Sequence, residues 1–182
     1  MNAPVLASDW PKARFTVAQI WALVEKGVIQ PDARFELLDG EVKDMSPKGP
    51  LHEEVRRAVN LWIKTLPADL ETLAETTLYL DASSFVEPDY VVFDAGLPME
   101  ALTPLNMRLI VEVAHESWAY DSGEKARRYA AAGAAEYWAI NAKTREILVH
   151  REPNENGWAE IQTIAPGESI APRFAPSSPL TL

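Results

Sequence analysis

The sequence contains no cysteine among its 182 residues. This absence excludes a disulfide framework, a thiolate metal site and a cysteine nucleophile. No uninterrupted apolar run approaches the roughly 18 residues of a membrane-spanning helix, and the N-terminus lacks a basic region followed by an apolar stretch. We therefore expect neither a membrane span nor a signal peptide. A cytoplasmic location fits both expectations.

Positive charge is also scarce. Lysine and arginine number 17 against 27 aspartates and glutamates, which gives a formal net charge of −10. Because affinity for nucleic acid depends on neutralising phosphates, this balance argues against a general nucleic-acid binder and would require a local basic patch. Five basic residues predict either such a patch or only the solvated faces of two helices: Arg56, Arg57, Lys125, Arg127 and Arg128.

The length of the chain and its 47% apolar composition fit one globular domain. Residues 1–14 hold two prolines and no clear periodicity, so we expect an N-terminal arm there and a single domain over residues 15–182. Helical periodicity or capping predicts helices over residues 16–27, 51–66 and 121–132. Strand-like runs cover residues 35–42, 72–81, 88–94, 109–113, 137–140, 147–150 and 158–161. The predicted fold class is therefore α/β (α+β).

Two local signals in these elements are specific. The dipeptide Asp39-Gly40 between two short apolar segments predicts a β-hairpin. The sequence Asp121-Ser122-Gly123-Glu124 has the side chains of a capping box and predicts a helix start. That helix would carry Lys125 in its first turn, close to the end of the preceding strand.

Glu112 is the carboxylate least expected from packing. It interrupts an apolar run, Leu109 to Val113, of the kind that forms a strand buried on both faces. An unpaired charge in such a place costs several kcal/mol, so Glu112 requires a cation, a proton or several hydrogen-bond donors. The sequence leaves two interpretations open, a buried ion pair and a functional site.

Asp89 lies on the strand that precedes the Glu112 strand, so the two carboxylates can meet at one end of a sheet. Neighbouring carboxylates repel unless a cation neutralises them, and Mg²⁺ commonly binds one or two carboxylates together with substrate phosphate. Lys125 would then act as a point charge on the phosphate or orient the attacking water. Taken singly, Asp89 is more often a strand-start aspartate bonded to backbone, and Lys125 is usually a solvated helix residue paired with an acid.

Two further residues have simple structural interpretations. Glu36 alternates with Phe35 and Leu37, which predicts a solvent-facing strand residue, and it could also add a third acid to the site. His52, at a helix start, is more simply a surface or capping residue than a metal ligand.

The order of the motifs is more specific than any one of them, and it resembles the Uma2 family of restriction endonucleases, which belongs to the PD-(D/E)XK nuclease superfamily. The resemblance runs from about Phe15 to the C-terminus. It rests on these pieces: Phe-Glu-Leu-Leu-Asp-Gly-Glu from Phe35, Met45-Ser46-Pro47 followed by His52, Pro88-Asp89, Val111-Glu112-Val113, Asp121, Lys125, Tyr129, Gly133 and Glu136-Tyr137-Trp138.

The resemblance implies a restriction-endonuclease-like fold, a mixed β-sheet flanked by α-helices, with a Mg²⁺-dependent phosphodiesterase site. Mn²⁺ is an alternative ion. Asp89 and Glu112 match the two acids of the superfamily motif, and Glu36 matches an early glutamate that implies a further metal ligand. The usual lysine two residues after the second acid is replaced by Ala114, and the resemblance implies that Lys125 supplies the amine.

The chain departs from the family pattern after Val113, where His115 and Glu116 replace the usual serine and proline. The resemblance nevertheless implies a metal-dependent endonuclease acting on nucleic acid, with DNA as the expected substrate, and a homodimer in which two sites meet two strands. The alternatives are a catalytically inactive nuclease-fold module for binding or assembly, and a hydrolase of smaller phosphate compounds.

Overall fold

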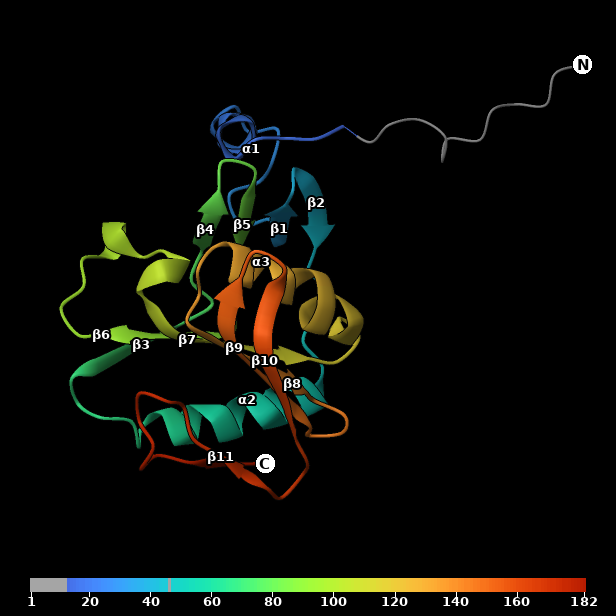
Figure 1. Cartoon of the computed structure of the whole chain (residues 1–182). Coiled ribbons are helices and arrows are strands. Elements are labelled where there is room, and N and C mark those ends of the chain that lie inside the picture. The colour runs from blue at the N-terminus through green and yellow to red at the C-terminus, as the bar shows by residue number, and fades with distance from the viewer. Residues whose placement is uncertain (1–12, 46) are drawn as a thin grey trace, which may run out of the picture.

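Two β-sheets form most of the fold in the computed structural model, which describes residues 13–45 and 47–182 (Figure 1). The larger sheet is mixed and has the strand order β10-β9-β8-β7-β6-β3, in which only β7 and β8 are parallel. The smaller, antiparallel sheet has the order β2-β1-β5-β4. The strands are β1 Phe35–Leu38, β2 Glu41–Asp44, β3 Leu70–Ala74, β4 Leu78–Asp81, β5 Ser84–Val86, β6 Tyr90–Asp94, β7 Met107–Ala114, β8 Glu136–Asn141, β9 Ile147–Asn154 and β10 Gly157–Ile164.

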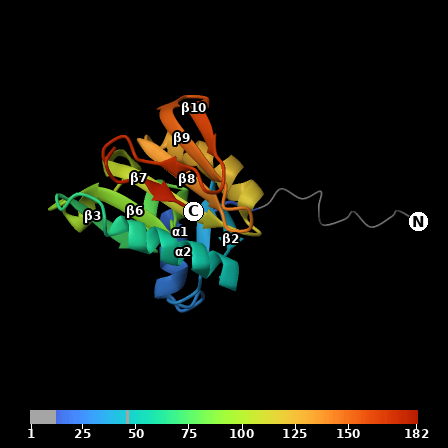
Figure 2. The ribbon, with the colours of Figure 1, turned by 90° about the horizontal axis from the view of Figure 1, so that it is seen from below.

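The helices lie on opposite faces of the six-stranded sheet. Helix α2 (Pro50–Ile63) runs under one face, next to the C-terminal strands β11 (Ser169–Ile170) and β12 (Leu180–Thr181), as Figures 1 and 2 show. On the other face lies a π-helical turn, Tyr120–Lys125, that continues as α3 (Ala126–Ala131). Helix α1 (Val17–Glu25) packs against the smaller sheet. Among the described residues, no helix has the length and apolar character needed to cross a membrane.

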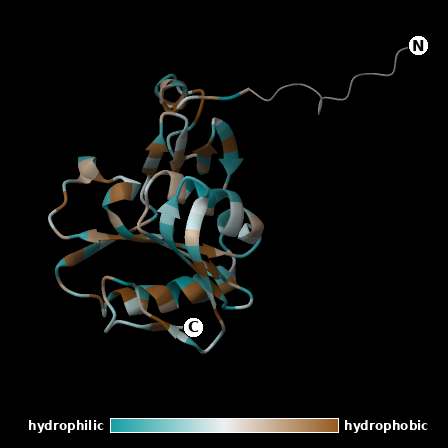
Figure 3. Cartoon of the chain, in the orientation of Figure 1, coloured by the Kyte–Doolittle hydropathy of each residue, from teal (hydrophilic) through white to brown (hydrophobic). Residues whose placement is uncertain are grey.

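Each face of the large sheet buries its own apolar cluster. Val55 and Val59 of α2 are buried against the strands, and the ring of Trp62 stacks on Trp138 of β8 with centroids 5.2 Å apart. On the opposite face, Tyr129 of α3 packs among residues of β6, β7 and β8. Figure 3 shows the hydrophobic residues gathered along the central strands. Because both faces are covered, β7 can be an almost continuous apolar run.

Several local predictions are confirmed. The helix predicted over residues 16–27 is α1, and Thr16 and Gln19 form a capping box at its start. Asp39 and Gly40 both have positive φ, as a type I′ hairpin turn requires, and they join β1 to β2. The three predicted strands after Gly133 form the antiparallel meander β8, β9 and β10. The mixed sheet flanked by helices is therefore confirmed as the fold class.

Two predicted elements are wrong in detail. The expected strand over residues 72–81 is divided between β3 and β4, which belong to different sheets. Glu75 at the break has φ +53°, and its N–H donates to the Pro88 carbonyl at 3.1 Å, so the chain leaves one sheet for the other there. The predicted capping box is absent, because Asp121 lies inside the helical segment and its side chain is buried.

The domain predictions are not tested by the fold. Of the predicted N-terminal arm, residues 1–12 lie outside the described residues. Arg14 lies within them and donates to the Asp39 carbonyl at 2.7 Å, which holds the end of this segment against the hairpin turn. A single domain over residues 15–182 stays a prediction.

We expect Gly40→Ala to destabilise the protein by about 2 kcal/mol, because strain from positive φ would be combined with a steric clash. Gly40 has φ +78°, and a Cβ there would lie 2.9 Å from the Phe15 carbonyl oxygen and from Arg14 Cβ. Gly167 has φ +83° with no atom within 4 Å, so Gly167→Ala is the matched control for φ strain alone. Urea denaturation measures both changes. Equal losses would contradict the proposed clash.

Candidate active site

A pocket of about 850 Å³ opens where the two sheets meet, at the point where β5 leads into β6. Elements far apart in the sequence supply its walls: β1, β2, the loop before α2, the start of α2, the β5–β6 connection, the end of β7 with the loop after it, and the π-helical turn. All four residues predicted for the site line this pocket, namely Glu36, Asp89, Glu112 and Lys125. The structure therefore brings the predicted residues together.

Lys125 is surrounded by three buried acids, Glu36, Glu112 and Asp121. We call these four residues the lysine centre. Lys125 Nζ is 2.6 Å from Glu36 Oε1 and 2.7 Å from Glu112 Oε1. Asp121 Oδ1 is farther away, at 3.9 Å. Each of the four residues is at most 5% exposed, so solvent screens these charges only weakly.

Burial decides the proton affinities in the lysine centre. It raises the pKa of Glu112 to about 8, although the nearby Lys125 ammonium acts in the opposite direction. Burial likewise raises the pKa of Asp121. For Lys125 burial alone would lower the pKa, but the carboxylates of Glu112, Glu36 and Asp121 outweigh it and raise the pKa well above its usual value. The lysine is therefore held as a cation.

Asp89 forms a second group, the Asp89 centre, with Lys48, His52 and Arg56. Its Oδ2 accepts a hydrogen bond from the Val113 N–H at 2.8 Å and lies 3.3 Å from His52 Nε2. Its Oδ1 lies 2.9 Å from Lys48 Nζ and 3.4 Å from Arg56 Nε. Burial would raise the pKa of Asp89, but the contacts with His52 and Lys48 outweigh it and lower the pKa to about 2. Asp89 is therefore an anion.

The strand register explains why Asp89 and Glu112 share the pocket. Tyr90 pairs with Val111 in the antiparallel β6–β7 ladder, so the residue before Tyr90 reaches the end of β7 where Glu112 lies. Pro88 favours an extended backbone and cannot donate to the ladder, which suits a strand start. The Glu36 carboxylate accepts from the Glu87 N–H at 2.9 Å and so joins the smaller sheet to this connection.

The π-helical turn is the element that directs Lys125 inward. Asp121 and Lys125 are both buried on it, and both side chains line the pocket. The Tyr137 hydroxyl donates to the Asp121 carbonyl at 2.9 Å and holds this wide turn against β8. Short π-helical segments occur frequently at functional sites.

The donor set can be compared with the needs of a divalent cation. Among the described residues, no group of three or more histidine, aspartate and glutamate side chains is arranged to hold a metal ion. Lys125 separates Glu36 from Glu112, and Lys48 contacts Asp89. The donors are nevertheless carboxylate oxygens, the type that Mg²⁺ prefers. The site fits a divalent cation in its chemistry.

The sequence interpretation missed part of the site. The solvent-facing alternative for Glu36 is wrong, since its side chain is buried against Lys125. The surface interpretation of His52 is also wrong, because the residue is 8% exposed beside Asp89. The place of His52 in the family pattern was an available signal. Lys48 carried no local signal, and the capping interpretation concealed the role of Asp121.

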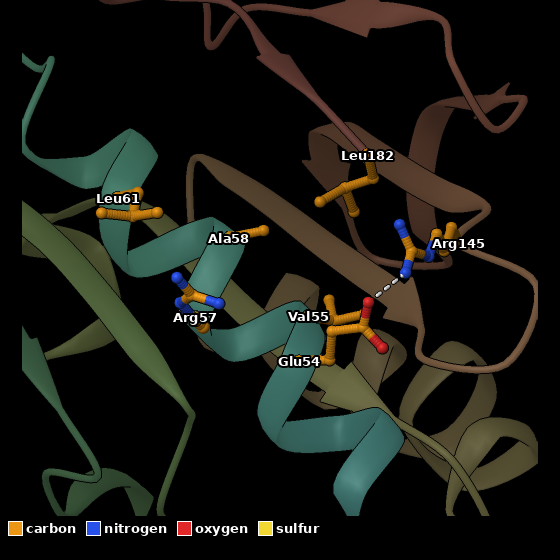
Figure 4. A pocket seen from close by; sticks show the side chains of 7 residues that line it. All are labelled: Glu54, Val55, Arg57, Ala58, Leu61, Arg145 and Leu182. Atoms are coloured by element: carbon orange, nitrogen blue, oxygen red, sulfur yellow. Dashed lines mark hydrogen bonds and ion pairs between the residues drawn. The ribbon is translucent and has the colours of Figure 1, made fainter.

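The residues of the predicted basic patch are dispersed. Arg56 faces Asp89, and Lys125 is buried in the lysine centre. Arg128 pairs with Asp39 and with Asp81. Arg57 lines a smaller pocket of about 300 Å³ beside α2, in which Glu54 and Arg145 form an ion pair at 2.6 Å (Figure 4). None of the residues predicted for the site lines this second pocket.

Comparison with known proteins places the chain in a family. The family Uma2, described as "Putative restriction endonuclease", matches residues 21–181. No curated protein matches this chain. One similar solved structure is described as "a putative nuclease belonging to DUF820" from Anabaena variabilis. It is 15% identical, the match covers 88% of this chain and 91% of that chain, and the TM-score of 0.63 supports a shared fold. Since the family match spans most of the sequence, including all four predicted site residues, the chain belongs to the Uma2 family.

Proposed function

We propose that this protein is a metal-dependent endonuclease that hydrolyses phosphodiester bonds of nucleic acid, with DNA as the expected substrate. The observation that carries the proposal is the meeting of three buried carboxylates and a buried lysine in one pocket, Glu36, Asp89, Glu112 and Lys125. Membership of the Uma2 family supports it. Anionic oxygens and an ammonium group together are suited to phosphoryl chemistry.

We assign Asp89, Glu112 and Glu36 as the acids that would hold Mg²⁺ or Mn²⁺. When bound, the ion would stabilise the negative charge that develops on the phosphate oxygens. Asp89 is anchored for this role by the Val113 N–H, and Glu112 by Lys125. Both carboxylates are fixed to adjacent strands of the sheet, so their separation is set by a rigid part of the fold.

Lys125 would orient the attacking water and stabilise the developing charge with its ammonium group. Its three acidic partners keep it protonated, so it acts as a point charge and not as a base. Lys48 is a second cation of the pocket wall, 2.9 Å from Asp89. We assign Lys48 to binding a phosphate oxygen of the substrate beside the one attacked. Pairing of two copies of the chain stays a prediction.

A second candidate is a nuclease-fold module that binds or assembles without cleaving. The observation that favours it is the occupation of the carboxylates by lysines, with Lys125 on Glu112 and Lys48 on Asp89. His115 and Glu116, at the departure from the family pattern, are exposed and line the same pocket. In such a module, removing the Asp89 carboxylate would change neither metal uptake nor partner binding.

The test of the proposed function is cleavage of supercoiled plasmid by the wild-type protein in Mg²⁺ and in Mn²⁺, with chelator as the control. We expect nicked and linear plasmid in either ion and none with chelator. A dinucleotide phosphodiester is assayed in parallel. Hydrolysis of the dinucleotide without cleavage of plasmid would replace the endonuclease by a hydrolase of smaller phosphates. Absence of cleavage of both substrates in both ions would favour the inactive module.

A further inference from the structure

Glu112 receives two donors on the same oxygen atom. The Tyr129 hydroxyl donates to Glu112 Oε1 at 2.8 Å, and Lys125 Nζ lies 2.7 Å from that atom. Among the described residues no hydrogen bond reaches the second oxygen, Oε2, while the Glu112 side chain lines the pocket. The carboxylate is therefore held by one oxygen and keeps the other for a ligand.

Helical spacing explains how both donors reach one carboxylate. Tyr129 follows Lys125 by four residues, so the two side chains lie one above the other on the same side of the helix. That side of the helix faces β7, where Glu112 lies near the strand end and is the one charged residue between Leu109 and Ala114. The helix supplies one charged and one neutral donor.

The phenol ring of Tyr129 is itself fixed. It is 0% exposed and packs against the Tyr137 ring at a centroid distance of 4.9 Å. A phenol carries its proton at neutral pH, so the Tyr129 hydroxyl is the donor in the contact with Glu112. A packed ring with a permanent O–H presents its hydrogen bond in one direction.

We infer that Tyr129 is a positioning residue, which holds Glu112 Oε1 so that Oε2 is presented to a divalent cation in the pocket. The inference rests on the proposed function, because it assigns Glu112 to that cation. Lys125 alone does not fix the carboxylate, since its ammonium is shared with Glu36 and is assigned to the substrate phosphate. A neutral hydroxyl orients Glu112 and adds no positive charge that would compete with a cation. Hydrogen-bond partners of metal ligands commonly contribute 10- to 100-fold to metal affinity.

The test is a calorimetric titration of the full-length protein with Mn²⁺, comparing wild type with Tyr129→Phe and Ser178→Ala. Each substitution removes one buried hydroxyl and its hydrogen bond. The Ser178 hydroxyl donates to the Thr65 carbonyl at 2.9 Å and Ser178 does not line the pocket, so Ser178→Ala is the control. We expect the Mn²⁺ dissociation constant to rise about tenfold or more for Tyr129→Phe and to change by less than about threefold for Ser178→Ala.

Thermal unfolding of the same variants separates positioning from folding. We expect similar small losses in Tm for both variants, because each loses one buried hydrogen bond. An unchanged Mn²⁺ affinity in Tyr129→Phe, or an equal loss in both variants, would overturn the inference and leave the proposed function standing. Absence of Mn²⁺ binding by wild type would overturn the metal assignment and the positioning role together.

Discussion

Glu112→Gln is expected to lower the cleavage rate of plasmid about 1000-fold or more, which corresponds to roughly 4 kcal/mol of lost transition-state stabilisation. Glutamine has nearly the shape of glutamate and can still accept the Tyr129 hydrogen bond, but it cannot supply an anionic oxygen to a cation. The substitution removes the negative charge and replaces one acceptor oxygen by an amide NH2, with little change of shape. The rate is measured under single-turnover conditions in Mg²⁺.

The same substitution is expected to leave the fold stable. Burial raises the pKa of Glu112 to about 8, so the protein already disfavours a charge at this position. A neutral amide there removes that cost, while Lys125 keeps Glu36 and Asp121 as partners. We expect Tm to stay unchanged or to rise. Activity would then be lost without loss of stability, as is typical of a residue retained for function.

Glu136→Gln is the control for this prediction. Glu136 is also a buried strand glutamate, and it pairs with Arg151 at 2.7 Å, but it does not line the pocket. We expect this variant to lose stability and to keep its cleavage rate per folded molecule. Unchanged cleavage by Glu112→Gln would remove Glu112 from the active site, whatever the behaviour of Glu136→Gln.

Lys125→Met is expected to destabilise the protein by about 3–5 kcal/mol at pH 8, because removing one partner of a buried ion pair leaves charge uncompensated. For a chain of this length the loss corresponds to a fall in Tm of roughly 10 °C. Three acids would be left without their cation: Glu36, Glu112 and Asp121. Lys64→Met, at an exposed position after α2, is the control and should change Tm little.

The destabilisation by Lys125→Met should depend on pH with a definite sign. Burial already raises the pKa values of Glu112 and Asp121, and without the ammonium both would rise further above their values in the unfolded chain. The folded state then binds more protons than the unfolded state at pH values above about 4.5, so its stability falls as the pH rises. We expect the difference in Tm from wild type to be smaller at pH 5 than at pH 8. A difference independent of pH would contradict the role of Lys125 as the counter-ion.

These two substitutions also separate the two proposed roles of the lysine centre. Glu112→Gln removes a negative charge that is costly to bury, whereas Lys125→Met removes the cation that permits its burial. The first is expected to affect catalysis and the second to affect both catalysis and stability. Opposite effects on stability would show that the centre is maintained for its chemistry and that its acids by themselves oppose folding.

Local sequence patterns determined much of the fold. The dipeptide Asp39-Gly40 predicted the hairpin because both residues tolerate positive φ, and the strand-like runs after Gly133 predicted the meander. Such signals succeed because each depends on residues within a few positions of one another. The interpretation of Asp121 as a helix cap failed for the same reason. Burial against distant strands outweighed a local capping preference worth about 1 kcal/mol.

For the site, the sequence by itself identified Glu112 as an acid out of place in an apolar strand, and the order of motifs identified the family. Only the tertiary structure decided which charges meet. Glu36 and Lys125 are 89 positions apart, and Lys48 and Asp89 are 41 apart. The environment of a charge depends on every element packed around it, and a buried ion pair is stable only when its partners arrive together. Spacing along the chain does not contain that information, whereas the junction of the two sheets does.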